Sequence, residues 1–284
     1  MLKNLSKKKK LRVLSLGAGV QSTTVALMIE KGEIPKVDCA IFADVKAEPQ
    51  EVYKHLNWLK TQLSYPLYVV SWRDLKKDIL NASKGKYKGF TAPFFSKNIS
   101  NNEKSMLRRQ CTSDYKIKPV IKKIRELLGY KKGDRVQKDT KVELLMGISI
   151  DEVQRMKTNR MKYIENQYPL IDKYISRKDC LTWIEKNNYP TPPRSACTFC
   201  PFHSNLEWHR IKTGNPKEWQ EVIKLDKAIR TQERFKKKNK GSGTLKDELY
   251  LHRSCKPIDE INFLNENENQ LNLFINECEG YCGI

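Results

Sequence analysis

A glycine-rich turn directly after a short apolar segment constrains the fold of this chain most. Residues 11–16 are mostly apolar, Gly17-Ala18-Gly19 follow, and residues 22–31 then show a helical pattern that stops at Gly32. A strand that turns tightly into a helix directs backbone N–H groups and the helix dipole at one point. The sequence therefore predicts an anion site that suits a phosphate or pyrophosphate group.

Small and hydroxyl-bearing residues make up this turn. The glycines and Ala18 let a ligand approach the backbone, while Ser22 and Thr23 add hydroxyl donors at the start of the helix. The turn lacks the lysine of a Walker P-loop and the glycine spacing of a dinucleotide fingerprint. A tight turn without a ligand therefore stays open as an alternative. The residues of this turn predicted to contact a nucleotide are Ser15, Gly17, Ala18, Gly19, Gln21, Ser22 and Thr23.

Strand and helix patterns alternate along the first half of the chain. Apolar segments at residues 37–43, 67–71 and 142–148 suggest further strands, and helical patterns cover residues 49–63 and 119–128. This alternation predicts an α/β fold with a Rossmann-like, doubly wound and mainly parallel sheet. Residues 81–102 are irregular, and we expect a loop over the site there. We expect three regions: a basic arm (1–10), a nucleotide-binding α/β domain (11–175), and a mainly helical, cysteine-containing lobe that faces nucleic acid (176–284).

A carboxylate follows the second predicted strand, in Phe42-Ala43-Asp44. Ligands of open parallel sheets bind outside the carboxyl ends of the strands, so Asp44 is placed to contact a ribose or a metal ion such as Mg²⁺. The alternative is a solvated charge at the end of a strand. Glu48 lies shortly after Asp44 and can act as a favourable charge at a helix N-terminus.

Positive charge dominates the sequence. Lys and Arg number 54 against 33 acidic residues, which gives a formal net charge of +21. Such a field favours polyanions, because each phosphate that is neutralised releases condensed counterions. A bias towards lysine that merely leaves the surface basic is the alternative. Clusters occur at residues 116–135 and 155–162, and the residues predicted to bind tRNA or DNA are Lys7, Lys8, Lys9, Lys10, Lys236, Lys237 and Lys238.

The chain contains eight cysteines with uneven spacing. No apolar run is long enough to cross a bilayer and no signal-peptide pattern follows the basic start, so we expect a cytoplasmic protein without a membrane partner. Thiols stay reduced in that compartment, so ligation or redox chemistry fits the spacing better than disulfides do. Cys197 and Cys200 form a Cys-x-x-Cys pair, and Cys111 lies far upstream in Arg108-Arg109-Gln110-Cys111.

Several short motifs follow one another in a fixed order. They are residues 16–23, Phe42-Ala43-Asp44, residues 111–119 beginning at Cys111, residues 147–152 with Arg155, Tyr168-Pro169-Leu170-Ile171, residues 195–201 and the tail at residues 277–283. In this order they resemble the phosphoadenosine phosphosulfate (PAPS) reductase-like family of the PP-loop adenine nucleotide α-hydrolases, from about Arg12 to the end. The resemblance implies an adenine nucleotide α-hydrolase-like fold that binds ATP or another adenine nucleotide such as PAPS. It also implies that Gly147 and Arg155 contact the nucleotide, with Arg155 on a phosphate.

The chain departs from the family pattern at several positions. Gly17, Ala18 and Gln21 replace a serine, a glycine and an aspartate of the usual PP-loop. Lys46 stands where related chains have a glycine, so either a backbone contact is lost or Lys46 itself touches phosphate. Gln110 stands where the iron–sulfur reductases of the family carry the first of two adjacent cysteines.

The resemblance makes Cys111, Cys197 and Cys200 the predicted ligands of a [4Fe–4S] cluster, with zinc as the alternative metal. Three thiolates are one short of a closed four-coordinate site. Either Cys282, Cys255 or His203 supplies the fourth ligand, or one iron stays open for sulfide or substrate, as in related tRNA thiolating enzymes. A structural zinc site and unligated core thiols remain alternatives.

Three functions remain open from the sequence. The first is an ATP pyrophosphatase that cleaves between the α and β phosphates, adenylates a nucleic acid and transfers sulfur to it from a sulfur donor. The second is a PAPS or adenosine phosphosulfate reductase, in which Cys278 attacks sulfur and thioredoxin or Cys282 resolves the intermediate. The third is a nucleotide-regulated nucleic-acid-binding protein without turnover.

Overall fold

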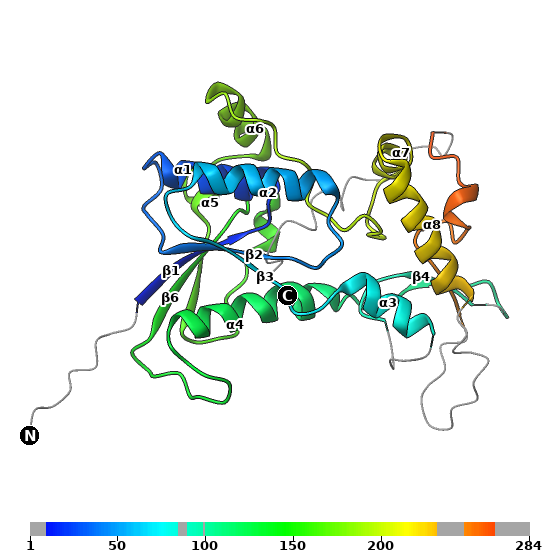
Figure 1. Cartoon of the computed structure of the whole chain (residues 1–284), viewed down its shortest axis with the longest axis horizontal. Coiled ribbons are helices and arrows are strands. Elements are labelled where there is room, and N and C mark those ends of the chain that lie inside the picture. Colours follow the sequence, from blue (N-terminus) through cyan, green and yellow to red (C-terminus); the bar gives the residue numbers. More distant parts are fainter. Residues whose placement is uncertain (1–9, 85–89, 99, 232–246, 265–284) are drawn as a thin grey trace, which may run out of the picture.

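The computed structural model describes residues 10–84, 90–98, 100–231 and 247–264. Its centre is a five-stranded parallel sheet in the order β3-β2-β1-β6-β7. Helices cover both faces of this sheet (Figure 1), so the predicted α/β fold with a mainly parallel sheet is confirmed. The strands are β1 (Lys10–Leu16), β2 (Cys39–Ala43), β3 (Leu67–Val70), β6 (Lys141–Met146) and β7 (Ile164–Gln167).

The two faces of the sheet are buried against different helices. Leu14 and Leu16 of β1 pack on the face covered by α1 (Val20–Glu30), α2 (Gln50–Gln62) and α6 (Arg177–Lys186). Val13 points to the other face, which α4 (Lys118–Leu127) covers. Successive residues of a strand alternate between faces, so one apolar strand serves both hydrophobic layers. The short α5 (Pro169–Asp172) follows β7.

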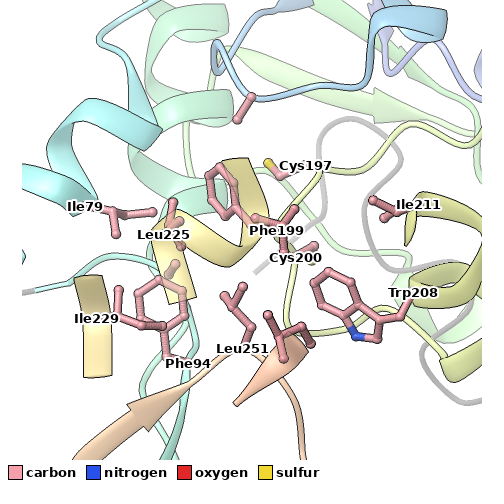
Figure 2. Close-up of a cluster of buried hydrophobic side chains, with 14 of the residues drawn as sticks. Ile79, Phe94, Cys197, Phe199, Cys200, Trp208, Ile211, Leu225, Ile229 and Leu251 are labelled. Carbon is pink, nitrogen blue, oxygen red and sulfur yellow. The ribbon is translucent and has the colours of Figure 1, made fainter. Parts of the chain in front are cut away.

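A second hydrophobic core lies beside the main sheet. Three helices, α3 (Leu75–Ser83), α7 (Asn205–Gly214) and α8 (Pro216–Thr231), contribute to it. They pack with a small antiparallel sheet in the order β5-β4-β8, formed by β5 (Lys104–Met106), β4 (Phe95–Lys97) and β8 (Glu248–Tyr250). Figure 2 shows Cys197 and Cys200 beside Phe199 in this cluster, with Trp208 close by. The Cys-x-x-Cys pair is therefore carried by a segment with its own packed surroundings.

A buried carboxylate anchors the last described segment to this second core. Asp226 of α8 is fully buried, and its two oxygens accept the backbone N–H groups of Leu251 and Ile258, each at 3.2 Å. Arg230 donates from Nε at 2.9 Å. Within the part of the chain that the structure describes, no helix has both the length and the apolar composition of a membrane span.

Candidate active site

The predicted phosphate turn connects β1 to α1 and is closed by its own side chain. Gly17 N–H donates to Ser22 Oγ at 3.2 Å, and Ser22 Oγ donates to the Gly19 carbonyl at 3.3 Å. Ala18 adopts φ +61°, and Gly19 caps the helix. Gly17, Ala18, Gly19 and Ser22 are all buried. The turn has the strand-to-helix geometry expected of an anion site, and the Ser22 hydroxyl serves to hold it in shape.

Gln21, which occupies the aspartate position of the family pattern, is buried next to this turn. Its Oε1 accepts a hydrogen bond from Arg177 Nη1 of α6 at 2.6 Å, and among the described residues its Nε2 has no hydrogen-bond partner. Thr23 points elsewhere, because its hydroxyl lies 3.1 Å from His55 Nε2 on α2. Burial lowers the pKa of His55 to about 4, so this ring is neutral at pH 7.

Gly147 supports the turn from the neighbouring strand. It follows β6, and a Cβ on it would lie 2.6 Å from both Cα and N of Ser22. Only glycine therefore allows the end of β6 to approach the first turn of α1 this closely. Gly147 contacts the backbone of the turn, and its contact with a nucleotide, which the resemblance implies, stays a prediction.

A pocket opens where β1 and β2 end. Ser15, Leu16 and Gly17 line one side, Phe42 and Ala43 another, and Lys116 and Val120 close it from the α4 side. This position, outside the carboxyl ends of parallel strands and beside a helix N-terminus, is where open α/β sheets bind nucleotides. We call it the nucleotide pocket.

Asp44, at the end of β2, has its oxygens engaged by its own surroundings. Oδ1 accepts the Lys46 N–H at 2.7 Å and the Tyr53 hydroxyl at 2.9 Å, and Oδ2 pairs with Lys46 Nζ at 2.8 Å. Lys46 adopts φ +61°, so the carboxylate fixes a tight turn in a left-handed conformation. Burial and the charge of Asp44 raise the pKa of Tyr53, which keeps this donor protonated.

Lys116 is the cation nearest the nucleotide pocket. It lies on a π-helix, η1 (Thr112–Ile117), that runs directly into α4. Its Nζ is 3.5 Å from Glu48 Oε1, and Ser195 Oγ donates to Glu48 Oε2 at 3.4 Å. The Glu48 side chain is fully buried and that of Lys116 is 11% exposed. This buried pair ties the segment after β2, the start of α4 and the cysteine loop together.

Lys116 also lines a second pocket, which contains all three predicted cysteine ligands. Cys111, Cys197 and Cys200 border it together with Arg109 and Phe202. Cys197 and Cys200 are held in a turn in which the Cys200 N–H donates to the Cys197 carbonyl at 2.9 Å. The guanidinium carbon of Arg109 lies 5.4 Å from the centroid of the Phe202 ring. We call this second site the thiol pocket.

The three cysteines fit a metal centre in part. They share one pocket, although 86 positions (197 − 111) separate the first two in the sequence. Within the described ranges, however, no three His, Cys, Asp or Glu side chains converge closely enough to hold a metal ion. Cys255 Sγ lies 4.0 Å from the Ser96 carbonyl, and the His203 ring donates from Nε2 to the Cys197 carbonyl at 2.8 Å. His203 Nδ1 has no hydrogen-bond partner among the described residues, and the fourth ligand stays a prediction.

The remaining predicted residues divide into two groups. Arg155, at the end of the 3₁₀-helix η2 (Ile150–Arg155), forms an ion pair with the buried Glu152 at 2.7 Å. Lys10 begins β1 and is exposed. The predicted residues outside the described ranges are Lys7, Lys8, Lys9, Lys236, Lys237, Lys238, Cys278 and Cys282.

Sequence reasoning missed several residues that complete the site. Lys116 was noticed only as one member of a basic cluster, and Arg177 was not singled out at all. Glu48 was considered only as a charge at a helix N-terminus, yet it is the buried partner of Lys116. The lysine spacing in residues 111–119 gave no usable signal, because a π-helix carries more residues per turn than the α-helix that a pattern assumes.

Comparisons with known proteins give little beyond the geometry. No protein-family model matches the chain, and no curated protein matches it. Among solved structures, one match is the crystal structure of phosphoadenylyl-sulfate (PAPS) reductase from Candida auris in a phosphate complex. It is 13% identical with a TM-score of 0.40, over 67% of this chain and 78% of that one. A likeness of this size carries no argument about function, so the assignment of function rests on the sequence motifs and on the two adjoining pockets.

Proposed function

We propose that this chain is an adenine-nucleotide-dependent enzyme that activates a nucleic acid at the nucleotide pocket and transfers sulfur to it through the thiol pocket. The observation that carries the proposal is that one largely enclosed cation, Lys116, whose side chain is 11% exposed, lines both pockets. A phosphate group at the turn of residues 17–22 and a thiol at Cys111, Cys197 or Cys200 would therefore lie on either side of the same ammonium group.

Lys116 suits this position on physical grounds. A cation next to a phosphate stabilises the charge that develops when a phosphoanhydride bond breaks, and it does so most strongly where water is excluded. The same cation favours the thiolate form of a nearby cysteine over the thiol. Glu48 holds the ammonium group in place while leaving it at the edge of both pockets.

The reaction would proceed in two displacements. A target atom of the nucleic acid attacks the α-phosphorus of ATP, and pyrophosphate leaves with the electron pair of the broken P–O bond. Sulfide supplied by a donor then attacks the carbon that bears the adenylated oxygen, a C–S bond forms, the C–O bond breaks, and AMP leaves with the electron pair of that bond. The residues named here would bind the phosphates, hold Lys116 and keep water out; a metal or [4Fe–4S] centre at Cys111, Cys197 and Cys200 stays a prediction.

The proposal is tested by exchange of labelled pyrophosphate into ATP with anaerobically purified protein and total tRNA or denatured DNA. Lys116→Ala should lose most of the exchange, whereas Lys116→Arg should retain part of it, because the charge is kept. Lys118→Ala is the matched control, since Lys118 is two residues away, exposed, and paired with Asp114 on the surface. Absence of exchange in the wild-type protein under every nucleic-acid condition would contradict the proposal.

A sulfonucleotide reductase is the second candidate, because the nucleotide pocket suits PAPS or adenosine phosphosulfate as well as ATP. In that case Cys278 would act as the nucleophile and the protein would release sulfite from PAPS or adenosine phosphosulfate with thioredoxin present. Loss of sulfite release in Cys278→Ser would favour this reaction. Nucleotide that is bound but never consumed would instead favour the third, non-catalytic possibility.

A further inference from the structure

Exposed apolar side chains and unpaired cations lie on the segments that flank the edge strand β7, with Lys157 beside its carboxyl end and Lys162 before its amino end. Tyr174 is 83% exposed, Val153 is 52% exposed, and Met156 and Met161 are each about two-fifths exposed. Lys157, Arg160 and Lys162 are exposed in the same stretch. In the part of the chain that the structure describes, the ion pairs include none to these three cations. We call this group of residues the Tyr174 surface.

Backbone contacts hold the Tyr174 surface together. Ile150 N–H, at the start of η2, donates to the carbonyl of Ile175 at 3.1 Å. Lys157 N–H donates to the Tyr168 hydroxyl at 2.9 Å, and that hydroxyl donates back to the Lys157 carbonyl at 2.7 Å. The cationic segment is thereby fixed onto the end of β7 and the start of α5.

Tyr174 has a conformation that a tyrosine adopts at a cost. It follows α5 with φ +54°, and its N–H donates to the Ile171 carbonyl at 2.9 Å. A left-handed residue at the end of a helix is usually glycine or asparagine, because a Cβ is strained there. The ring that this backbone presents is almost fully in solvent, so it contributes little to the core. A strained and exposed aromatic residue indicates binding rather than packing.

Residues close in sequence to the Tyr174 surface, Arg177 and Gly147, contact the nucleotide turn. Arg177 donates from its guanidinium to Gln21 Oε1 at 2.6 Å and from its N–H to Asp151 Oδ2 at 2.5 Å. Gly147 packs on the backbone of Ser22. A polymer bound across this surface would therefore reach the edge of the sheet at which the phosphate turn lies.

We propose that the Tyr174 surface binds an unpaired stretch of nucleic acid, with a base stacked on Tyr174 and phosphates on Lys157, Arg160 and Lys162. This inference rests on the proposed function. Single strands combine exposed base faces with a charged backbone, and proteins bind them by pairing aromatic residues with cations. Three cations without carboxylate partners match a phosphate backbone better than they match a typical protein surface. In a duplex the bases are stacked on one another, so no base face is open to the Tyr174 ring.

The experiment measures the anisotropy of labelled 12-nucleotide RNA, DNA and duplex DNA with the full chain, without ATP. Tyr174→Gly removes the ring and relieves the backbone, so lost binding cannot be attributed to strain. Stacking contributes about 1–3 kcal/mol per base, so its affinity for single strands should fall roughly 5- to 150-fold, while Tyr174→Phe should bind like the wild type. The RNA and DNA arms identify which polymer is preferred.

A charge-matched pair of variants tests the cations. Replacing Lys157, Arg160 and Lys162 with glutamine should reduce the salt dependence of log K by about 2, because each single-strand phosphate contact contributes about 0.7. Replacing Lys131, Lys132 and Arg135, exposed residues of the loop that precedes β6 and outside the Tyr174 surface, should change it far less.

Three outcomes overturn the inference: Tyr174→Gly with wild-type affinity, equal losses in the two triple variants, or a wild-type protein that binds no single strand at low salt. Adenine nucleotide binding is measured on the same samples. A wild-type protein that binds no adenine nucleotide would count against the proposed function. If the wild type binds nucleotide and Tyr174→Gly binds single strands as tightly as the wild type does, the result would count against this surface alone.

Discussion

Gly147 lies so close to Ser22 that a single added carbon would reach 2.6 Å from the Ser22 backbone. Two neighbouring parallel strands, β1 and β6, end side by side here, and the turn after β1 is supported by the residue that follows β6. The phosphate turn is thus shaped by a contact between segments that are 125 positions apart (147 − 22).

Gly147→Ala should distort the turn. Overpacking of a tight contact costs about 1–3 kcal/mol in the free energy of unfolding, and the displaced α1 N-terminus should also weaken nucleotide binding. Gly214→Ala is the matched control, because a Cβ at Gly214 meets nothing within 4 Å. Urea denaturation and calorimetric titration with ATP measure the two effects. Equal behaviour of both variants would show that the end of β6 moves away without cost.

Gly19→Asp should strongly weaken nucleotide binding in a protein that still folds. Gly19 is the N-cap of α1 with an extended backbone, and aspartate is a favoured residue at such a position. The new carboxylate would, however, face the anion that the turn is expected to bind, so affinity should fall on the order of tenfold or more. A folded Gly19→Asp protein with unchanged ATP affinity would show that phosphate binds elsewhere.

The sequence was sufficient for most of the main sheet and insufficient for its edge strand β7 and for the small antiparallel sheet of the second core. The apolar strands β1, β2, β3 and β6 were predicted within about two or three residues, because buried parallel strands are continuous apolar runs. β7 was missed, since its sequence Ile164-Glu165-Asn166-Gln167 has neither an apolar run nor a clear alternation. β4 lies inside residues 81–102, which were expected to form a loop.

Contacts between distant side chains explain what the sequence did not reveal at the site. Cys111 and Cys197 were grouped from the motifs, and they do line one pocket. The pairing of Lys116 with Glu48 and of Arg177 with Gln21 depends on how the loops pack after the sheet has formed. No local sequence pattern encodes such pairs. A charged residue at a strand end can therefore be predicted from the sequence, but the residue that pairs with it cannot.

Cys111→Ser and Cys197→Ser should lose metal to a similar degree, because neither position can hold a centre alone. Cys39→Ser is the control, because Cys39 is buried in β2 between the sheet and α4 and does not line the thiol pocket. Iron, sulfide and zinc analysis of anaerobically purified protein gives the readout. Cys282→Ser adds a fourth case, in which lost metal would mean a site capped by the tail. Full metal content in Cys111→Ser would leave only the Cys-x-x-Cys pair as a candidate ligand set.

His55→Gln should flatten the acid side of the stability profile. Burial lowers the pKa of His55 from 6.5 to about 4 in the folded protein, so between these values the unfolded chain binds the extra proton more readily. The neutral ring therefore contributes stability that is complete above about pH 6.5 and is lost as the pH falls towards 4. Glutamine can still bond Thr23 but does not titrate, so the free energy of unfolding of the variant should decline less between pH 7 and pH 4.5.

The control for this measurement is His209→Gln, which removes a partly exposed histidine of α7 in place of a buried one. Part of the acid sensitivity should persist in His55→Gln, because burial also lowers the pKa of His203 to about 4. The double variant His55→Gln/His203→Gln should therefore be flatter than either single variant, if the two sites act independently. If His55→Gln follows the wild-type curve at every pH, the ring is already accessible to protons in the folded protein, and the layer between α1 and α2 opens behind the phosphate turn.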